Sequence, residues 1–227
     1  AARKPVTRIG NWDMEKIKNW AFENHDLAFA ILLAVCVYAY FAFTNDLFAT
    51  HRTGYAIMER FAVLGLVGLA LTLCIIAGEI DLSIGSNAAL AAVIVVRFTD
   101  SLGAIPSLFI AVAISTLIGA IQGYFIAYLR VRAIVLTVGT LMLLRGVALF
   151  AAEEKTVMLT DFRMTDFIST KMLWYFSPAS LLVIAMFVVV GLFMTYTRYG
   201  REIYAIGGAR KEAIAAGIDL KRPMIIV

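Results

Sequence analysis

Long apolar runs separated by short polar segments dominate this sequence. The runs cover residues 27–43, 61–78, 84–96, 104–129, 133–152 and 172–196. Most are long enough to cross a hydrocarbon core of about 30 Å as a helix that rises about 1.5 Å per residue. Their apolarity is continuous rather than alternating, and a backbone in lipid must satisfy its own hydrogen bonds. The pattern therefore predicts an all-α fold, a polytopic α-helical membrane bundle with about six transmembrane helices.

The second and third runs leave two arrangements open. A polar break at residues 79–83 separates them. The pair is either two full crossings or two broken helices that meet within the membrane. Both arrangements give the same orientation to everything that follows.

Composition supports lipid as the main solvent of this chain. Of the 227 residues 62% are hydrophobic and only 16% are charged, whereas an average soluble domain is about 45–50% apolar. A water-soluble chain of this length cannot bury so much apolar surface in one core. The charged residues flank the apolar runs, which is typical of topology signals and argues against binding of nucleic acid.

The distribution of lysine and arginine predicts the orientation. With a cytoplasmic N-terminus, the inner segments hold 13 basic residues and the outer segments hold 6. The inner segments are residues 1–26, 130–132 and 197–223, and the outer segments are residues 44–60, 97–103 and 153–171. The positive-inside rule therefore favours a cytoplasmic N-terminus and a cytoplasmic final loop.

Four parts of the chain follow from this topology. They are a cytoplasmic N-terminal segment (1–26), a transmembrane bundle (27–196), a cytoplasmic loop (197–223) and the start of a further helix (224–227). Pro223 directly precedes the apolar residues 224–227, and proline is favoured at the first position of a helix, so these residues resemble the first turn of another apolar helix. We therefore expect the chain to be the N-terminal portion of a longer protein.

The polar break is the first candidate site. It brings Glu79, Asp81, Ser83, Ser86 and Asn87 beside the membrane interior, where such groups are costly unless they are paired, solvated or functional. Glycines on both sides permit an irregular backbone, as in the broken helices of transporters. The break either lines or gates a translocation path, or it supplies Asp81 or Ser83 as the N-cap of the next helix. The two roles are compatible.

The second candidate lies in the fifth apolar run, which contains Thr137, Thr140 and Arg145. An arginine deep within a membrane span should face the bundle interior or a wet cavity. We expect it to find a partner such as Glu79 or Asp81. The pair would be either a fixed ion pair inside the bundle or a direct contact with the solute.

The third candidate is the loop at residues 198–218. An alanine-rich piece at 209–216 is predicted to be a short helix that ends at Gly217, and Gly207 and Gly208 precede it. Such a helix is suited to docking in a partner's groove. The residues alone equally allow an amphipathic segment held at the membrane surface by anionic lipid.

Other patterns are weaker or absent. Gly119 and Gly123 have the spacing that allows close approach of helices. Cys36 and Cys74 lie inside apolar runs and are expected to be buried, unpaired thiols. The sequence contains no phosphate-binding loop, metalloprotease motif or nucleophile elbow. We therefore expect no catalytic residues, no metal site and no cofactor, and no ATP hydrolysis by this chain.

Three motifs resemble one known family. They are GEIDLSIGS at 78–86, LTVGTLMLLRG at 136–146 and TRYGREIYAIGGARKEAIAAGIDLKRP at 197–223. In this order, from about residue 60 to the end, the chain resembles the ribose/xylose-type permeases of bacterial ABC importers. The resemblance implies a bacterial inner-membrane subunit of roughly ten helices that pairs with a second permease, identical or different. It also implies a monosaccharide or related small polar solute, a periplasmic binding protein and a cytoplasmic ATPase.

The resemblance also assigns roles to residues. The stretch from Glu212 to Gly217 is similar to the family's coupling loop, whose short helix docks on the ATPase. The residues so implied in ATPase coupling are Gly208, Arg210, Glu212, Ala213, Ala216 and Gly217. The family commonly has two glycines before Ile-Asp-Leu-Ser, and Glu79 replaces one of them here. Two other functions stay open: an ion-coupled secondary carrier that uses Glu79, Asp81 and Arg145, and a membrane scaffold that transports nothing.

Overall fold

The computed structural model describes residues 24–155, 166, 169–170 and 175–227. Most of the predicted N-terminal segment 1–26 therefore lies outside the described residues. Helices make up most of what is described, which confirms the prediction of an all-α chain. The chain divides into two compact units, residues 1–54 and 55–227, and each is described by itself.

The first unit contains α2 (His25–Thr44), which has no buried residue. The helix stops at Asn45, whose side-chain Oδ1 accepts a hydrogen bond from the backbone N–H of Leu47 at 3.0 Å. This local bond offers the backbone a turn in place of a further helical residue. The ring of Phe48 then folds back on Tyr38 and Phe41, with ring centroids 5.4 Å apart in both cases.

The second unit holds most of α3 and all the later helices. Their bounds are α3 (His51–Ile76), α4 (Ile84–Leu102), α5 (Ala104–Leu129), α6 (Ala133–Ala151), α8 (Pro178–Tyr196), α9 (Arg198–Gly208), α10 (Arg210–Ala215) and α11 (Lys221–Ile226). Within the described part of the chain, five helices are long and apolar enough to cross a membrane, namely α2, α3, α5, α6 and α8. The sequence predicted about six, and the difference is α4, which carries Arg97 and Asp100 in its last turns.

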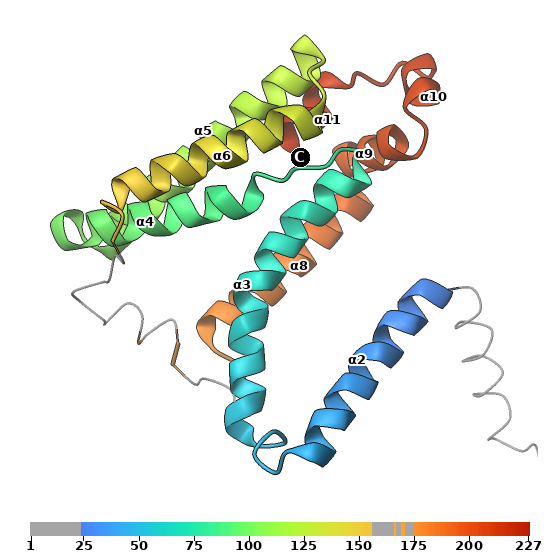
Figure 1. Ribbon diagram of the computed structural model, residues 1–227. Helices are drawn as coiled ribbons and strands as arrows, with labels where there is room; N and C mark the ends of the chain where they lie inside the picture. The colour runs from blue at the N-terminus through green and yellow to red at the C-terminus, as the bar shows by residue number, and fades with distance from the viewer. Residues whose placement is uncertain (1–23, 156–165, 167–168, 171–174) are drawn as a thin grey trace, which may run out of the picture. The chain divides into compact units, whose positions relative to one another are not determined.

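Helices α4, α5 and α6 run side by side (Figure 1). Their shared core is formed by Leu90, Ile94, Ala111, Leu144 and Ala148. The runs 61–78 and 84–96 therefore belong to two separate helices, α3 and α4, which residues 77–83 connect.

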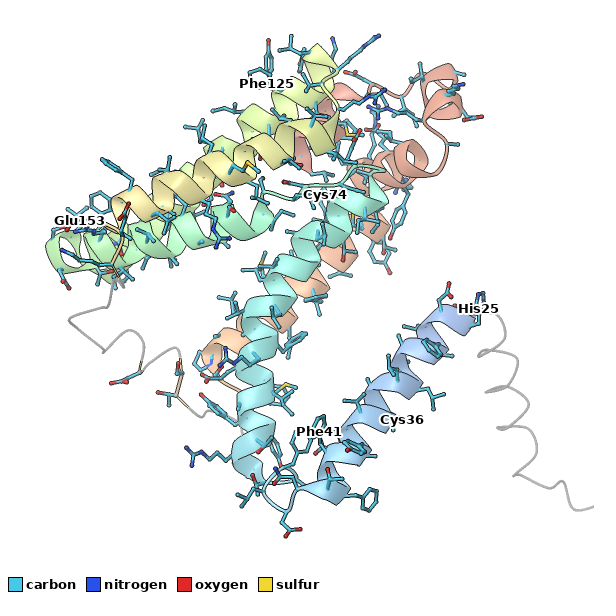
Figure 2. All side chains as sticks on the ribbon, viewed as in Figure 1. His25, Cys36, Phe41, Cys74, Phe125 and Glu153 are labelled. Atoms are coloured by element: carbon cyan, nitrogen blue, oxygen red, sulfur yellow. The ribbon has the colours of Figure 1, made fainter. Side chains whose placement is uncertain are left out.

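Arg97, near the end of α4, is hydrogen-bonded to the end of α6. Its Nε donates to the carbonyl of Ala151 at 2.8 Å, and its Nη2 donates to Glu153 at 2.6 Å. The last carbonyls of a helix have no partner within the helix, so a cation at this place satisfies one of them. Figure 2 shows Glu153 at the opposite end of the α4–α6 group from Phe125.

Helices α3 and α8 form the second group of this unit (Figure 1). The rings of Phe61 and Phe187 stack with centroids 6.0 Å apart. The start of α8 is fixed by a capping box, in which Ser177 and Ser180 exchange hydrogen bonds, and by proline at the first helical position. The predicted span 172–196 therefore begins its helix at Pro178.

The ends of α3 and α8 meet α9, α10 and α11 in a second core. Its buried members are Ala77, Met194, Ile203, Ile206, Ala213 and Met224. Cys74, on the last turns of α3, is a buried free thiol, whereas Cys36 of α2 is free and exposed (Figure 2). The prediction of two unpaired thiols is confirmed, and the prediction that both are buried is wrong for Cys36.

Large apolar side chains cover much of the surface. Leu64 and Phe109 are each 70% exposed and Val135 is 67% exposed. A water-soluble monomer rarely presents apolar patches larger than a few hundred Å². With five helices of spanning length in the described residues, this surface identifies a multi-pass membrane protein.

The two glycines of the predicted close-approach motif have different surroundings. A Cβ at Gly123 would lie 3.0 Å from the Cα of Ile225 and 3.2 Å from the carbonyl oxygen of Met224, whereas a Cβ at Gly119 would meet nothing within 4 Å. We expect Gly123→Ala to destabilise the protein by about 1–3 kcal/mol because α11 must move away from α5. Gly119→Ala, the matched control, should leave the melting temperature in detergent unchanged or slightly higher. Equal melting temperatures for the two variants would contradict the α5–α11 contact.

Candidate functional site

The junction between α3 and α4, residues 77–83, is the centre of the candidate site. Helix α3 ends in a Schellman turn, in which the N–H of Gly78 donates to the carbonyl of Ile75 and the N–H of Glu79 to that of Cys74, both at 3.0 Å. Gly78 has a φ of +79°, which glycine adopts without the steric cost of a Cβ. This glycine therefore sets the direction in which the junction leaves α3.

Side-chain hydrogen bonds join the junction to α5. Asp81 Oδ1 accepts from the backbone N–H and the hydroxyl of Ser83, both at 2.7 Å. The Ser83 hydroxyl in turn accepts from Nε2 of Gln122 at 2.9 Å. Ser83 is 1% exposed and Gln122 7%, so water competes little for these bonds.

The predicted capping role is only partly confirmed. Ser83 occupies the N-cap position of α4, but its side chain makes no capping hydrogen bond. Its hydroxyl is already bonded to the Asp81 carboxylate and the Gln122 amide. The polar side chains of the break therefore connect the junction to α5 and do not cap the N-terminus of α4.

Thr137 of α6 reaches the same junction. Its Oγ1 donates to the carbonyl of Ile80 at 3.4 Å, and the residue is 1% exposed. The structure thus brings together Asp81, Ser83 and Thr137, three of the residues proposed for the path or gate, and adds Gln122, which the sequence analysis missed.

Ser86 and Asn87 lie within the first turn of α4, just beyond the junction. Ser86 is 9% exposed. Asn87 Nδ2 donates to the carbonyl of Ser115 at 3.4 Å, whereas the buried Asn87 Oδ1 has no hydrogen-bond partner among the described residues. A buried acceptor without a partner is costly. The Asn87 amide, like the Ser86 hydroxyl, is thus a polar group on the interior side of α4.

Thr140 and Arg145 do not join the cluster. The Thr140 hydroxyl bonds to the Leu136 carbonyl of its own helix at 2.9 Å. The Arg145 side chain is exposed, and no ion pair joins it to a residue that the structure describes. The predicted pairing of Arg145 with Glu79 or Asp81 is therefore wrong. Arg145 lies eight residues beyond Thr137 on α6, or about 12 Å along the axis, which is too far from the junction.

Glu79 pairs instead with Arg210, the first residue of α10. Its Oε1 lies 2.6 Å from Nη1 of the arginine, and the side chains are 19% and 45% exposed, respectively. The two residues are 131 positions apart, so no sequence pattern marks the pair. The bond joins the first candidate site to the third.

Helix α10 ends in a second Schellman turn. The N–H of Gly217 donates to the carbonyl of Ile214 at 2.9 Å, and the N–H of Ile218 to that of Ala213 at 3.0 Å. Gly217 has a φ of +81°. The short helix predicted at 209–216, with Gly217 just past its end, is confirmed by these bonds.

The two faces of α10 differ. Ala213 is 5% exposed and packs in the core with residues of α9. Lys211, Glu212 and Ile214 are exposed. Gly208, the last residue of α9, and Ala216, just after α10, are also exposed. The short helix therefore buries one alanine and presents Lys211, Glu212 and Ile214 outward.

A second ion pair lies in the first turns of α9, the helix that precedes α10. Arg198 Nε donates to Glu202 Oε1 at 2.7 Å, one turn along the helix. The hydrogen bond and the charge of Glu202 raise the pKa of the Arg198 guanidinium further above its already high value. Arg198 therefore stays cationic at every physiological pH.

Two cavities open at the junction. The larger, about 1010 Å³, is lined by Glu79 and by the cations Arg130, Arg132, Arg210 and Lys221. Arg130 and Arg132 belong to the connection between α5 and α6, so this connection and the α3–α4 junction line the same cavity.

The smaller cavity, about 400 Å³, is lined by both polar and apolar side chains. Its polar walls come from Glu79, Asp81, Thr116, Gln122 and Thr137. Carboxylate, amide and hydroxyl groups can accept and donate hydrogen bonds in the way that a polyhydroxylated solute requires.

The buried bond between Ser83 and Gln122 gives a direct test of the cluster. Ser83→Ala removes a bond to Asp81 and leaves the Gln122 amide without its acceptor, so we expect a loss of about 1–3 kcal/mol. Thermal unfolding in detergent should show it as a decrease of roughly 5 °C. Ser101→Ala is the matched control on the same helix, because that exposed hydroxyl donates to the carbonyl of Phe98 in its own helix. A Ser83→Ala protein that melts with the control would contradict the network.

Comparisons with known proteins all find permease components of transport systems. The model of the family described as "Branched-chain amino acid transport system / permease component" matches residues 55–227. The L-arabinose transport system permease protein of Escherichia coli K12 is 30% identical over 209 residues, which is 88% of this chain and 60% of that protein. The chain thus spans less than two thirds of the length of this relative.

Other relatives from the same organism are similar over most of this chain. The D-allose transport system permease protein is 25% identical over 225 residues, covering 93% of this chain and 68% of the relative. The ribose import permease protein is 27% identical over 215 residues, covering 92% and 65%, respectively. No solved structure gives a significant match. The matched region holds the junction, the Glu79–Arg210 pair and the helix α10, and this chain belongs to the family of branched-chain amino acid transport system permease components.

Proposed function

We propose that this chain is part of the permease subunit of an ATP-binding-cassette importer, which moves a monosaccharide or similar small polar solute across the bacterial inner membrane. Its partners in this proposal are a cytoplasmic ATPase, a second permease and a periplasmic binding protein. The chain itself catalyses no reaction, and the ATPase supplies the energy.

The observation that carries the proposal is the form of α10. A six-residue helix, stopped by a glycine turn and anchored through Ala213, presents Lys211, Glu212 and Ile214 to the outside. A short helix with one buried face and one open face is suited to insertion in a groove of another protein. The residues proposed for ATPase coupling are Gly208, Arg210, Glu212, Ala213, Ala216 and Gly217.

The charge distribution supports a cytoplasmic position for this end. Arg130 and Arg132 line the same cavity as Arg210 and Lys221, so the basic loops predicted to be inside are neighbours. Basic residues concentrate on the cytoplasmic side of inner-membrane proteins. We therefore assign the cytoplasm to the end that holds the α5–α6 connection and the loop 197–223. The count of basic residues separately favours a cytoplasmic N-terminal segment.

A sugar is favoured as the solute over an amino acid. The relatives reported above are named for transport of L-arabinose, D-allose and ribose. The smaller cavity offers Asp81, Gln122 and Thr137, which together give acceptors and donors without a free cation for a carboxylate. Glu79, Asp81, Ser83, Ser86, Asn87 and Thr137 are the residues we propose for the inner path or gate.

Alternating access is the proposed mechanism. ATP binding draws the ATPase subunits together, and the docked α10 moves with them. Movement of the junction then shifts the start of α4 against α5 and α6, which opens or closes the path on the cytoplasmic side. Thr140 and Arg145 lie outside this cluster and have no part in the gate that we propose.

Copurification with the ATPase tests the docking role. Glu212→Arg reverses the charge on the exposed face of α10 without touching its anchor, and we expect it to reduce the ATPase recovered with the permease by about tenfold or more. Glu154→Arg, an exposed reversal at the opposite end of the α4–α6 group, is the matched control. Recovery of the ATPase at wild-type level with Glu212→Arg would count against docking through α10.

A further inference from the structure

The Glu79–Arg210 bond joins two elements whose backbones are each fixed locally. Glu79 follows directly after the glycine turn that ends α3, and Arg210 opens α10. The charged atoms are 2.6 Å apart, and the Glu79 side chain is only 19% exposed. A charge-assisted bond of this length between positioned partners resists displacement more than a flexible surface pair does.

A backbone contact lies directly beside the ion pair. A Cβ at Gly78 would lie 3.3 Å from the Cα of Gly207, and a Cβ at Gly207 would overlap the carbonyl oxygen of Ile76 and lie 2.8 Å from its carbonyl carbon. The end of α9 therefore touches the end of α3 at a distance that only glycine permits. The last residues of α9 and the first of α10 cannot slide over the junction without disturbing both contacts.

The other side of the junction holds the transmembrane helices. Ile80 and Asp81, the next two residues after Glu79, connect to Thr137 of α6 and, through Ser83, to Gln122 of α5. If Glu79 moves, the residues that follow it in the junction must move as well. These residues are hydrogen-bonded to α5 and α6 and lead directly into α4.

We propose that the Glu79–Arg210 pair is a coupling contact, which ties the docking helix α10 to the α3–α4 junction so that movement of α10 moves the start of α4. This inference rests on the proposed function. Glu79 and Arg210 act as positioning residues and need not touch the solute. The competing explanation is a structural ion pair that affects only stability.

Charge reversal and charge exchange separate the two explanations. In proteoliposomes that hold the complete transporter, we measure sugar taken up and ATP hydrolysed. Glu79→Arg and Arg210→Glu should each lower the uptake per ATP hydrolysed by about tenfold. The double variant Glu79→Arg/Arg210→Glu exchanges the two charges, restores the pair and should return this ratio to within about twofold of wild type.

The Arg198–Glu202 pair of α9 supplies the matched control. It has a similar length, 2.7 Å, but both of its members lie on one helix, so it connects nothing to the junction. Reversal of Glu202 should leave the uptake per ATP unchanged. Single reversals of Glu79 and Arg210 that behave like this control, or an exchanged pair that stays uncoupled, would overturn the coupling role.

Cross-linking measures the contact without relying on transport. Glu79→Cys and Arg210→Cys are combined in a background in which Cys36 and Cys74 are replaced, and membranes are treated with a short bismaleimide. We expect an internal cross-link that abolishes ATP-driven uptake while nucleotide still binds to the ATPase. Absence of the cross-link would overturn the contact itself. If the cross-link forms but the transporter without these substitutions shows no ATP-driven uptake, the proposed function fails, and the coupling role fails with it.

Discussion

Gly207→Ala should cause the largest loss of stability of the substitutions considered. The added Cβ would overlap the carbonyl oxygen of Ile76 and lie 2.8 Å from its carbonyl carbon. Both atoms belong to the backbone, so no side-chain rotation relieves the overlap, and the end of α9 must move off α3. We expect a loss of about 3 kcal/mol, at the upper end of overpacking, and an apparent melting temperature in detergent lower by roughly 10 °C.

The neighbouring glycine provides the control. A Cβ at Gly208 would meet nothing within 4 Å, so Gly208→Ala should change the stability by no more than about 0.5 kcal/mol. The two variants make the same chemical change one residue apart on α9. If Gly207→Ala melts at the wild-type temperature, the close approach of α9 to α3 is wrong.

Gly217→Pro should have the largest effect on coupling. Gly217 has a φ of +81°, whereas proline requires about −65°, and the change also removes the N–H that bonds to Ile214 at 2.9 Å. We expect the turn that ends α10 to open at a local cost of about 3 kcal/mol. ATP-driven uptake should decrease by at least about tenfold, and the ATPase should no longer copurify in normal amounts.

The membrane bundle should remain intact in this variant. Helix α10 has only Ala213 buried, so its loss removes little of the core, and the melting temperature should change by only a few degrees. Gly217→Asn is the control, because asparagine adopts the left-handed conformation more readily than other residues, and it should keep most of the uptake. Uptake that is equally low in both variants would show that the turn conformation is not the cause.

Hydropathy located the membrane helices but not all of their ends. The uncharged run 104–129 corresponds to α5 because the ends of the apolar surface and of the helix coincide at Gly103 and Arg130. Helix α3 instead begins at His51, ten residues before its apolar run, since helical hydrogen bonding continues through residues 51–60, where polar and charged residues are mixed with apolar ones. The start of α8 had a readable signal, because Ser177-Pro178-Ala179-Ser180 is a capping pattern that apolar run length overlooks.

The candidate site was predictable wherever it is local in sequence. Glycine turns at Gly78 and Gly217 follow from the chemistry of helix ends. Gln122 was missed although it is the only glutamine in the sequence and stands in an uncharged membrane run, where an amide must find a partner. The sequence analysis paired Glu79 with Arg145 because an arginine deep within a membrane span needs a partner. The actual partner of Glu79 is Arg210, which is 131 positions away in the sequence.

Sugar uptake into proteoliposomes tests the central claim most directly. The permease is reconstituted with and without its ATPase, and uptake of radiolabelled arabinose, ribose and allose is measured with ATP, with a non-hydrolysable analogue, and with a proton or sodium gradient alone. We predict uptake of at least one of these sugars that requires both the ATPase and hydrolysable ATP. Uptake by the permease alone under an ion gradient would contradict the account and identify a secondary carrier.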